Sequence, residues 1–293
     1  MAYRLRQREA VADGIERIAH EQFDAALAEL QRGDRTRGIH AARKRLKMLR
    51  ALLRLVRSAV SNKTFKRHNQ LLRDVGRLLS PIRDADVLAA LVKSLQRDTG
   101  SPTRALQQIE QRVFLQRHAA QRALLEPAQL RAITARMEAA RDSQDEWTSG
   151  LGADAVLHGL WDSYRRARRV FKTARTSRED DCWHEWRKRA KDFWYHMRLV
   201  ERAWPTALGA TVDRCDELGD QLGDDHDLAV LATRLDQLAP GASRSHDRRL
   251  VRHLIADRRQ RLQREAREAG ERLFSDAASD FDRRMRVCWK RWR

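Results

Sequence analysis

Apolar residues recur every three or four positions along most of this chain, which is the spacing of helices that bury one face. The sequence therefore predicts helices over residues 5–31, 36–59, 61–79, 82–97, 103–124 and 127–143. Further helices are predicted over residues 151–175 and 181–202 and from Pro205 onward. Turn and helix-stop residues separate the predicted helices at 33–34, 80–81, 99–102 and 240–243. With only 5 Pro and 13 Gly in 293 residues, the chain is predicted to be all-α.

The polar face of the predicted helix 36–59 carries only cations. At 100° per residue, its basic side chains and one histidine fall within an arc of roughly 120°. These residues are His40, Arg43, Lys44, Lys47, Arg50 and Arg54. The opposite face is apolar and consists of Ala42, Leu46, Leu49, Leu52, Leu53 and Val56. Because like charges four residues apart destabilise a helix by a few tenths of a kcal/mol per pair, we expect this face to meet an anionic ligand.

This cationic pattern occurs a second time. Shifted by 144 residues, the basic face of helix 36–59 falls on His184, Arg187, Lys188, Lys191 and Arg198. A later segment, SPIRDADVL at residues 80–88, falls on GDDHDLAVL at residues 223–231 when it is shifted by 143 residues. The two sets of matches predict an internal duplication into two similar helical bundles, residues 1–146 and 147–293.

The charge and composition of the chain point to its partners and its compartment. A net charge of +19 and a sequence pI of about 11.0 predict a polyanionic partner, whether nucleic acid, anionic lipid or another phosphate polymer. No run of 18 or more apolar residues is present and the N-terminus has no apolar segment, so neither a membrane-spanning helix nor a signal peptide is expected. The three widely spaced cysteines fit a reducing compartment. A cytoplasmic protein with no membrane partner is therefore expected.

The two copies of H-x-x-R-K-x-x-K, each followed by L-x-x-x-[RH]-D, resemble the CHAD family, the conserved histidine α-helical domain. The resemblance covers essentially the whole chain, and Tyr195, four residues after Lys191, matches the second-half form of the family. It implies two helical bundles related by a pseudo-two-fold axis around a basic central channel, binding of inorganic polyphosphate and, in bacteria, association with polyphosphate granules. It implies no catalytic activity. Two positions depart from the pattern, because Trp194 stands where the first copy has Arg50, and Ser80 stands where a glycine is expected.

The residue types suit a flexible phosphate polymer, since Lys supplies a point charge and Arg a planar fork for two phosphate oxygens. Helical spacing repeats a cation about every 5 Å along the axis, so two facing basic helices would line both sides of a groove. Cations on the helix at 151–175 are expected to add a second wall. The predicted polyphosphate-binding residues are His40, Arg43, Lys44, Lys47, Arg50, Arg54, Arg165, Arg169, Lys172, His184, Arg187, Lys188, Lys191, Tyr195, Arg198 and Arg202. Asp84 and Asp227 are predicted to hold basic side chains in place. No catalytic residue, cofactor or metal is expected.

A metal-dependent phosphohydrolase is a second interpretation. His226-Asp227 could belong to an H…HD…D set of metal ligands. The matching dipeptide of the first half is Arg83-Asp84, in which Arg cannot bind a metal. Nearby cations also repel metal ions, so His40 and His184 are better suited to donate to phosphate.

Binding of single-stranded nucleic acid is a third interpretation. Trp183, Trp186 and Trp194 lie beside the second basic motif, where they could stack on bases. Trp residues in helices more often belong to the core, however. The sequence shows no helix-turn-helix, zinc-finger or RNP signature.

Overall fold

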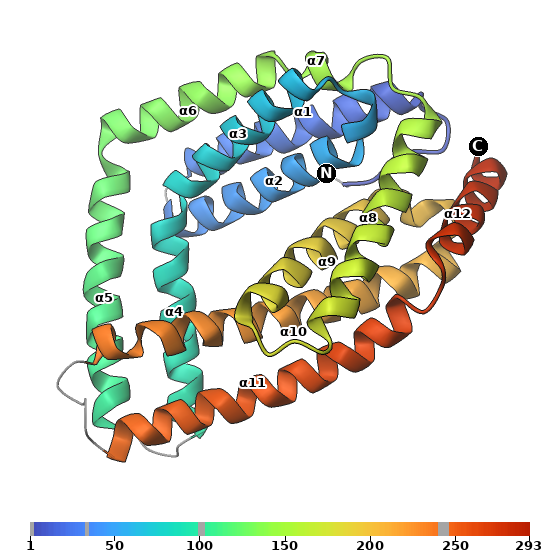
Figure 1. The fold of residues 1–293 in the computed structure, drawn as a ribbon. Helices are drawn as coiled ribbons and strands as arrows, with labels where there is room; N and C mark the ends of the chain where they lie inside the picture. The colour runs from blue at the N-terminus through green and yellow to red at the C-terminus, as the bar shows by residue number, and fades with distance from the viewer. Residues whose placement is uncertain (1–2, 33–34, 99–102, 240–245) are drawn as a thin grey trace.

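The computed structural model describes residues 3–32, 35–98, 103–239 and 246–293, and every regular element in these ranges is a helix (Figure 1). In chain order the α-helices are α1 (Val11–Leu30), α2 (Arg35–Leu55), α3 (Asn62–Leu78), α4 (Ser80–Asp98), α5 (Arg104–Leu125), α6 (Pro127–Asp142), α7 (Asp145–Thr148), α8 (Ala153–Ala174), α9 (Asp180–Val200), α10 (Pro205–Leu238), α11 (His246–Leu273) and α12 (Ala278–Trp292). Short 3-10 helices follow α2 (η1, Arg57–Ala59) and α9 (η2, Glu201–Ala203). The prediction of an all-α protein is confirmed. None of the helices in these ranges combines the length and the apolar character that crossing a membrane requires.

Local sequence sets the ends of several helices. The Ser61 side chain precedes α3 and accepts a hydrogen bond from the Thr64 N–H at 3.1 Å. Pro127 and Pro205 occupy the first turns of α6 and α10, where a backbone N–H has no helical partner to lose. α3 and α4 are separated at Leu79, and Pro81 lies in the first turn of α4. The other predicted breaks, at 33–34, 99–102 and 240–243, lie outside the described residues.

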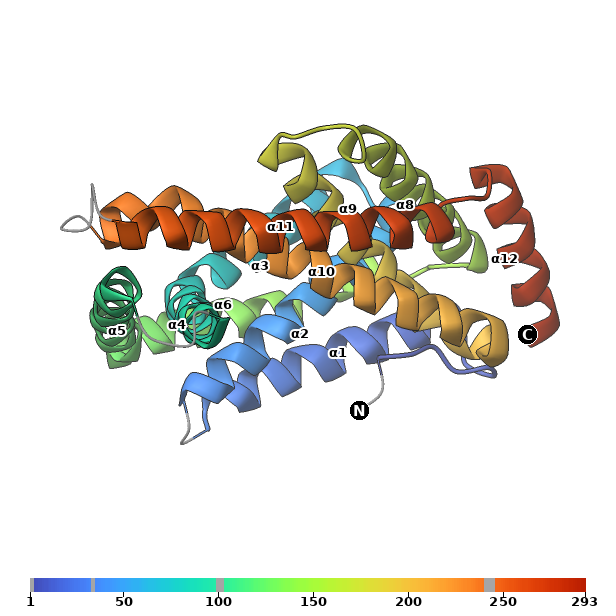
Figure 2. The same cartoon turned by 90° about the horizontal axis from the view of Figure 1, so that it is seen from below.

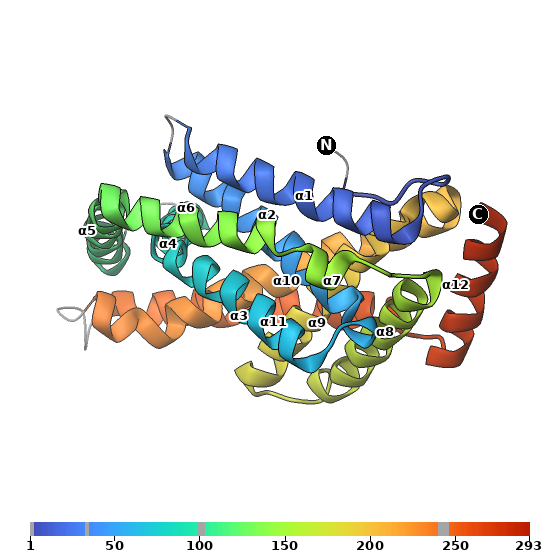
Figure 3. The same ribbon diagram turned by 90° about the horizontal axis from the view of Figure 1, so that it is seen from above.

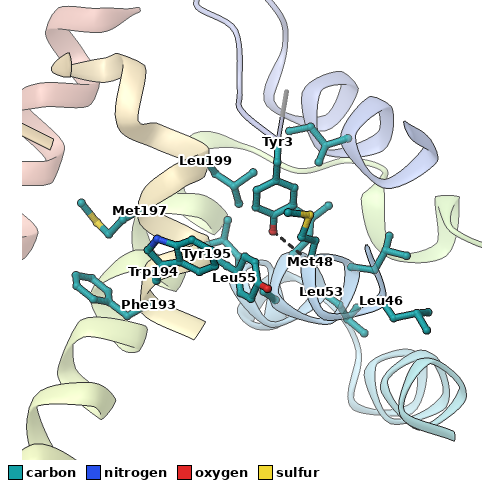
Figure 4. Close-up of a cluster of buried hydrophobic side chains, with 14 of the residues drawn as sticks. Tyr3, Leu46, Met48, Leu53, Leu55, Phe193, Trp194, Tyr195, Met197 and Leu199 are labelled. Carbon is teal, nitrogen blue, oxygen red and sulfur yellow. Dashed lines mark hydrogen bonds between the residues drawn. The ribbon is translucent and has the colours of Figure 1, made fainter. Parts of the chain in front are cut away.

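The first helix is shorter than predicted, because it begins at Val11 and not at residue 5. The preceding segment lies against α2 and against the last turn of α9. The Leu5 N–H donates to the Leu199 carbonyl at 2.9 Å, and the Tyr3 hydroxyl donates to the Met48 carbonyl at 3.0 Å (Figure 4). Leu5 extends the apolar stripe in the sequence, but it is fully buried against α9 without being helical.

The apolar faces of the helices form two separate cores, and neither core divides at the predicted boundary between residues 146 and 147, which falls inside α7. The larger core joins side chains of α1, α2 and α3 to those of α8 and α9. The smaller core joins Val92 of α4 and Ile109 of α5 to Leu231 of α10 and Ile255 of α11. In Figures 1 and 2, α4 and α5 run side by side and cross the ends of α10 and α11. The pair α4 and α5 thus buries its apolar face against the pair α10 and α11 from the other half.

The order of the helices is similar in the two halves. A shift of 143 or 144 residues places α1 and α2 on α8 and α9, and it places α3 and α4 together on the long helix α10. Pro81 interrupts the helix in the first half, whereas Asp224 lies at the matching position inside α10. Seen from above, α5 and α12 lie at opposite ends of the molecule, with α2 and α10 between them (Figure 3).

Candidate functional site

Helix α2 separates its two faces as its sequence predicts. The six apolar residues Ala42, Leu46, Leu49, Leu52, Leu53 and Val56 are each at most 2% exposed. Gly38 allows α2 to lie close against α1, because a Cβ at this position would come within 2.1 Å of the Glu29 carbonyl oxygen. The basic face of α2 is thereby turned away from the core.

This basic face lines a cleft of about 1240 Å³ between α2, α3 and α4 on one side and α9 and α10 on the other. The lining includes fourteen Lys and Arg side chains and eight Asp and Glu side chains. The cations are Arg4, Arg43, Lys44, Lys47, Arg50, Arg54, Arg73, Arg77, Arg83, Arg187, Lys188, Arg189, Lys191 and Arg198. A cleft with this excess of cations can hold an extended anion along its length.

Eleven of the sixteen predicted binding residues line the cleft. They are His40, Arg43, Lys44, Lys47, Arg50, Arg54, Arg187, Lys188, Lys191, Tyr195 and Arg198. The other five, Arg165, Arg169, Lys172, His184 and Arg202, are not part of the lining. Arg165, Arg169 and Lys172 are exposed on α8, whose opposite face packs in the core, so α8 does not form a second wall.

Two arginines of α2 are fixed by neutral partners and not by carboxylates. Arg43 Nη1 donates to the Gly76 carbonyl at 2.6 Å and also to the Ser80 hydroxyl, which ties α2 to the junction of α3 and α4. Arg50 Nε donates to Asn69 Oδ1 at 3.2 Å. Burial lowers the pKa of Arg43, and burial together with Arg54 lowers the pKa of Arg50 to about 10. Neutral partners leave the charge of both guanidinium groups available to an anion.

Lys47 lies in the strongest concentration of positive charge. Loss of hydration within the cleft and repulsion by Arg83, Arg187, Arg43 and Lys191 lower its pKa to about 8. Lys47 makes no ion pair with any carboxylate that the structure describes. Its ammonium group is therefore held in an unfavourable potential that a bound anion would relieve.

Ion pairs connect the two sides of the cleft. Arg54 Nη2 of α2 lies 2.6 Å from Asp192 Oδ1 of α9. Arg83 of α4 lies 3.5 Å from Asp84 and 3.9 Å from Asp227 of α10. Burial raises the pKa of Asp227, and the nearby Arg83 and Arg187 oppose that rise. Both predicted positioning carboxylates thus adjoin an arginine of the cleft, and Asp227 itself lines it.

Aromatic residues of α9 support its cations. Trp194 stands where α2 has Arg50, and its ring lies 5.0 Å from Lys191 Nζ and 4.9 Å from the Arg198 guanidinium carbon. Tyr195 is buried, which raises its pKa to about 12, so its hydroxyl stays protonated at neutral pH. Trp183, Trp186 and Trp194 are 2%, 0% and 8% exposed, which confirms that they belong to the core.

A family model for the CHAD domain matches residues 17–236. The chain belongs to the CHAD domain family. Among solved structures, it is similar to the crystal structure of the CHAD domain from the plant Ricinus communis, with a TM-score of 0.55 and 19% sequence identity. That similarity covers 94% of this chain and 96% of the plant chain. No curated protein matches the chain.

The histidines of this CHAD domain occupy two different environments. His40 lines the cleft, and burial followed by repulsion from Arg83 lowers its pKa. His184 and His226 form a stacked pair with their Nδ1 atoms 3.2 Å apart. Burial and the nearby Arg187 lower the pKa of His226 to about 4, and burial followed by Lys188 lowers that of His184. Both imidazoles are therefore uncharged at neutral pH, so that one can donate to the other.

The cleft of the CHAD domain also contains five cations that are not among the predicted binding residues, namely Arg4, Arg73, Arg77, Arg83 and Arg189. Arg73 and Arg77 stand four residues apart on α3, so a search for cations at helical spacing could have found them. Arg4 could not be found in this way, because it precedes the first helix. Among the described residues, no three His, Cys, Asp or Glu side chains are arranged to hold a metal ion.

Proposed function

We propose that this CHAD domain binds inorganic polyphosphate in the cleft as a non-catalytic binding module. The observation that carries the proposal is the convergence of cations from four helices, α2, α3, α4 and α9, on a single cleft. A polyphosphate chain has about one negative charge per unit and no other recognisable group, so a continuous row of Lys and Arg donors is what its binding requires.

The energetics of the free cleft support an anionic ligand. The lowered pKa values of Lys47 and Arg50 mean that the folded protein holds charged groups where burial and their neighbours disfavour charge. A phosphate polymer would supply the missing counter-charge and several hydrogen-bond acceptors. Binding therefore relieves a repulsion that folding alone leaves in place.

The buried tryptophans favour a phosphate polymer over single-stranded nucleic acid. Proteins that bind single strands without sequence preference use exposed aromatic faces on which bases stack. Trp183, Trp186 and Trp194 are each at least nine-tenths buried, and Trp194, which lines the cleft, has Lys191 and Arg198 against its ring. Association with polyphosphate granules in the cytoplasm would follow from the proposed binding.

The test is a competition between long-chain polyphosphate and single-stranded DNA of similar charge for the purified protein at moderate salt. We expect polyphosphate to displace the DNA, and a preference for DNA would overturn the assignment. Affinity should fall steeply with salt, by about 0.7 log units per log unit of salt for each neutralised phosphate if the polymer behaves like a single-stranded nucleic acid. A flat salt dependence would mean that the cations of the cleft do not bind the polymer.

A further inference from the structure

The two sides of the cleft carry different charges at matching positions. α10 lines the cleft with Asp213, Asp216, Asp220, Asp224 and Asp227, which are spaced three or four residues apart and so share one face. Shifted by 143 residues, Arg73 and Arg77 of α3 fall on Asp216 and Asp220. Two cations on one side of the cleft thus correspond to two carboxylates on the other.

The whole lining follows the same division. α2, α3 and α4 contribute eight Lys and Arg side chains and, among the described residues, no carboxylate. All eight carboxylates of the lining come from the second half of the chain: Glu185, Asp192, Glu201, Asp213, Asp216, Asp220, Asp224 and Asp227. We call the cleft-lining cations of α2, α3 and α4 the basic wall, and we call the cleft-lining carboxylates of α10 the acidic stripe.

Because the two sides of the cleft differ in charge, two corresponding lysines have different charged neighbours. Lys191 Nζ lies 3.3 Å from Asp220 Oδ1 and 4.0 Å from Asp216 Oδ1. Gly219 makes room for this arrangement, because a Cβ there would come within 2.7 Å of Lys191 Cε and Nζ. Lys47, the matching residue of α2, has only cations as its strongest charged neighbours. Lys191 is therefore already neutralised in the free protein, whereas Lys47 is not.

We propose that the acidic stripe keeps the bound polyanion away from α10, on the basic wall and the neighbouring Arg187 of α9, and thereby selects polyanions whose charges lie along a single line. This inference rests on the proposed function. A single phosphate chain carries only one row of charges, so it can lie against the basic wall without a second row facing α10. A duplex nucleic acid carries a second row of phosphates across a groove about 6 to 12 Å wide. When one of its strands lies on the basic wall, the other faces the carboxylates of the acidic stripe, and like charges repel.

The test compares the affinities of long-chain polyphosphate and duplex DNA for the wild-type protein and for Asp216→Asn/Asp220→Asn at one moderate salt concentration. Both side chains are at least half exposed, and the substitutions keep their shape, so the fold should be retained. We expect duplex DNA to bind at least about tenfold more tightly to the variant and polyphosphate to gain clearly less, because the freed Lys191 is open to both ligands, whereas only the duplex brings a second row of phosphates close to the lost carboxylates.

The matched control is Glu217→Gln/Glu271→Gln, which removes the same two charges from exposed positions outside the cleft. If the control gains as much affinity for duplex DNA as the cleft variant, net charge alone explains the effect and the inference is overturned. An unchanged ratio of the two affinities in the cleft variant would also overturn it. In either case the proposed function stands if wild-type protein binds polyphosphate and loses it when the basic wall is reversed. If that reversal has no effect, the proposed function itself fails.

Discussion

Helices α2 and α8 carry cations at similar helical spacing, and the fold gives them opposite surroundings. The cations of α2 meet those of α3, α4 and α9 across a cleft, where burial and repulsion lower the pKa of Lys47 and Arg50. Those of α8 face outward. Arg165 lies 2.7 Å from Asp162 Oδ1 and 4.9 Å from the Trp161 ring. A row of cations therefore becomes a candidate binding site only when other elements enclose it.

The largest effect is expected when the charges of cleft-lining cations on α2 and α3 are reversed, and the same reversal on α8 serves as the comparison. Lys44→Glu/Lys47→Glu/Arg73→Glu/Arg77→Glu should weaken polyphosphate binding by more than about a hundredfold, because each lost charge-assisted hydrogen bond accounts for about 1.5–3 kcal/mol. Titration with labelled polyphosphate measures the affinity, and circular dichroism checks that helicity is retained.

The matched variant on α8 is Arg165→Glu/Arg166→Glu/Arg169→Glu/Lys172→Glu, which changes the net charge by the same amount. It should weaken binding by less than about threefold, because exposed charges farther than a Debye length of about 10 Å from the ligand are screened. Comparable losses in the two variants would show that net charge and not the cleft determines binding.

A smaller effect concerns the inner face of α8, which supports α2. A Cβ on Gly159 would lie 1.9 Å from the Leu55 carbonyl oxygen, and a backbone atom cannot move aside as a side chain can. Gly159→Ala should therefore lower the free energy of unfolding by about 1–3 kcal/mol, as overpacking does. Chemical denaturation measures the change. Gly76→Ala on α3, where a Cβ would meet nothing within 4 Å, is the control and should be neutral or stabilising. An equal loss in the control would show that the contact between α8 and α2 is not the cause.

Most of the fold could be predicted because helical periodicity is a local property. The apolar positions from Ala42 of α2 to Val56, the residue after α2, are buried as their spacing predicts. The pairing of α4 and α5 with α10 and α11 could not be predicted. One apolar helix face can pack against almost any other, and the spacing of apolar residues does not specify the partner helix.

The candidate site could be predicted only in part, for the same reason. The repeated basic motif led to Lys47 and Lys191, which line the cleft. Charge spacing alone could not separate the outward-facing Arg169 from the cleft-lining Arg73, because the difference lies in tertiary packing. The spacing of charged residues also did not predict the acidic stripe, because Asp216 and Asp220 have the pattern of ordinary solvent-exposed positions on an amphipathic helix.

The smallest expected effect is a pH dependence that only the cations crowded together in the cleft should show. In the free protein, loss of hydration and the cations Arg83, Arg187, Arg43 and Lys191 lower the pKa of Lys47 to about 8. A bound polyanion favours the charged ammonium and raises this pKa, so above pH 8 binding must take up a proton. Affinity should therefore be constant near pH 7 and fall about tenfold by pH 9, since one pKa unit corresponds to about 1.4 kcal/mol.

The variant Lys47→Arg isolates this contribution, because Arg keeps its charge throughout that pH range. It should bind with nearly the same affinity at pH 7 and pH 9, whereas Lys172→Arg on α8 should retain the wild-type pH dependence. The histidines titrate at lower pH, since burial and neighbouring cations lower the pKa values of His40, His184 and His226, so they do not contribute between pH 7 and 9. A tenfold fall that persists in Lys47→Arg would assign the proton uptake to another group and remove Lys47 from the centre of the binding site.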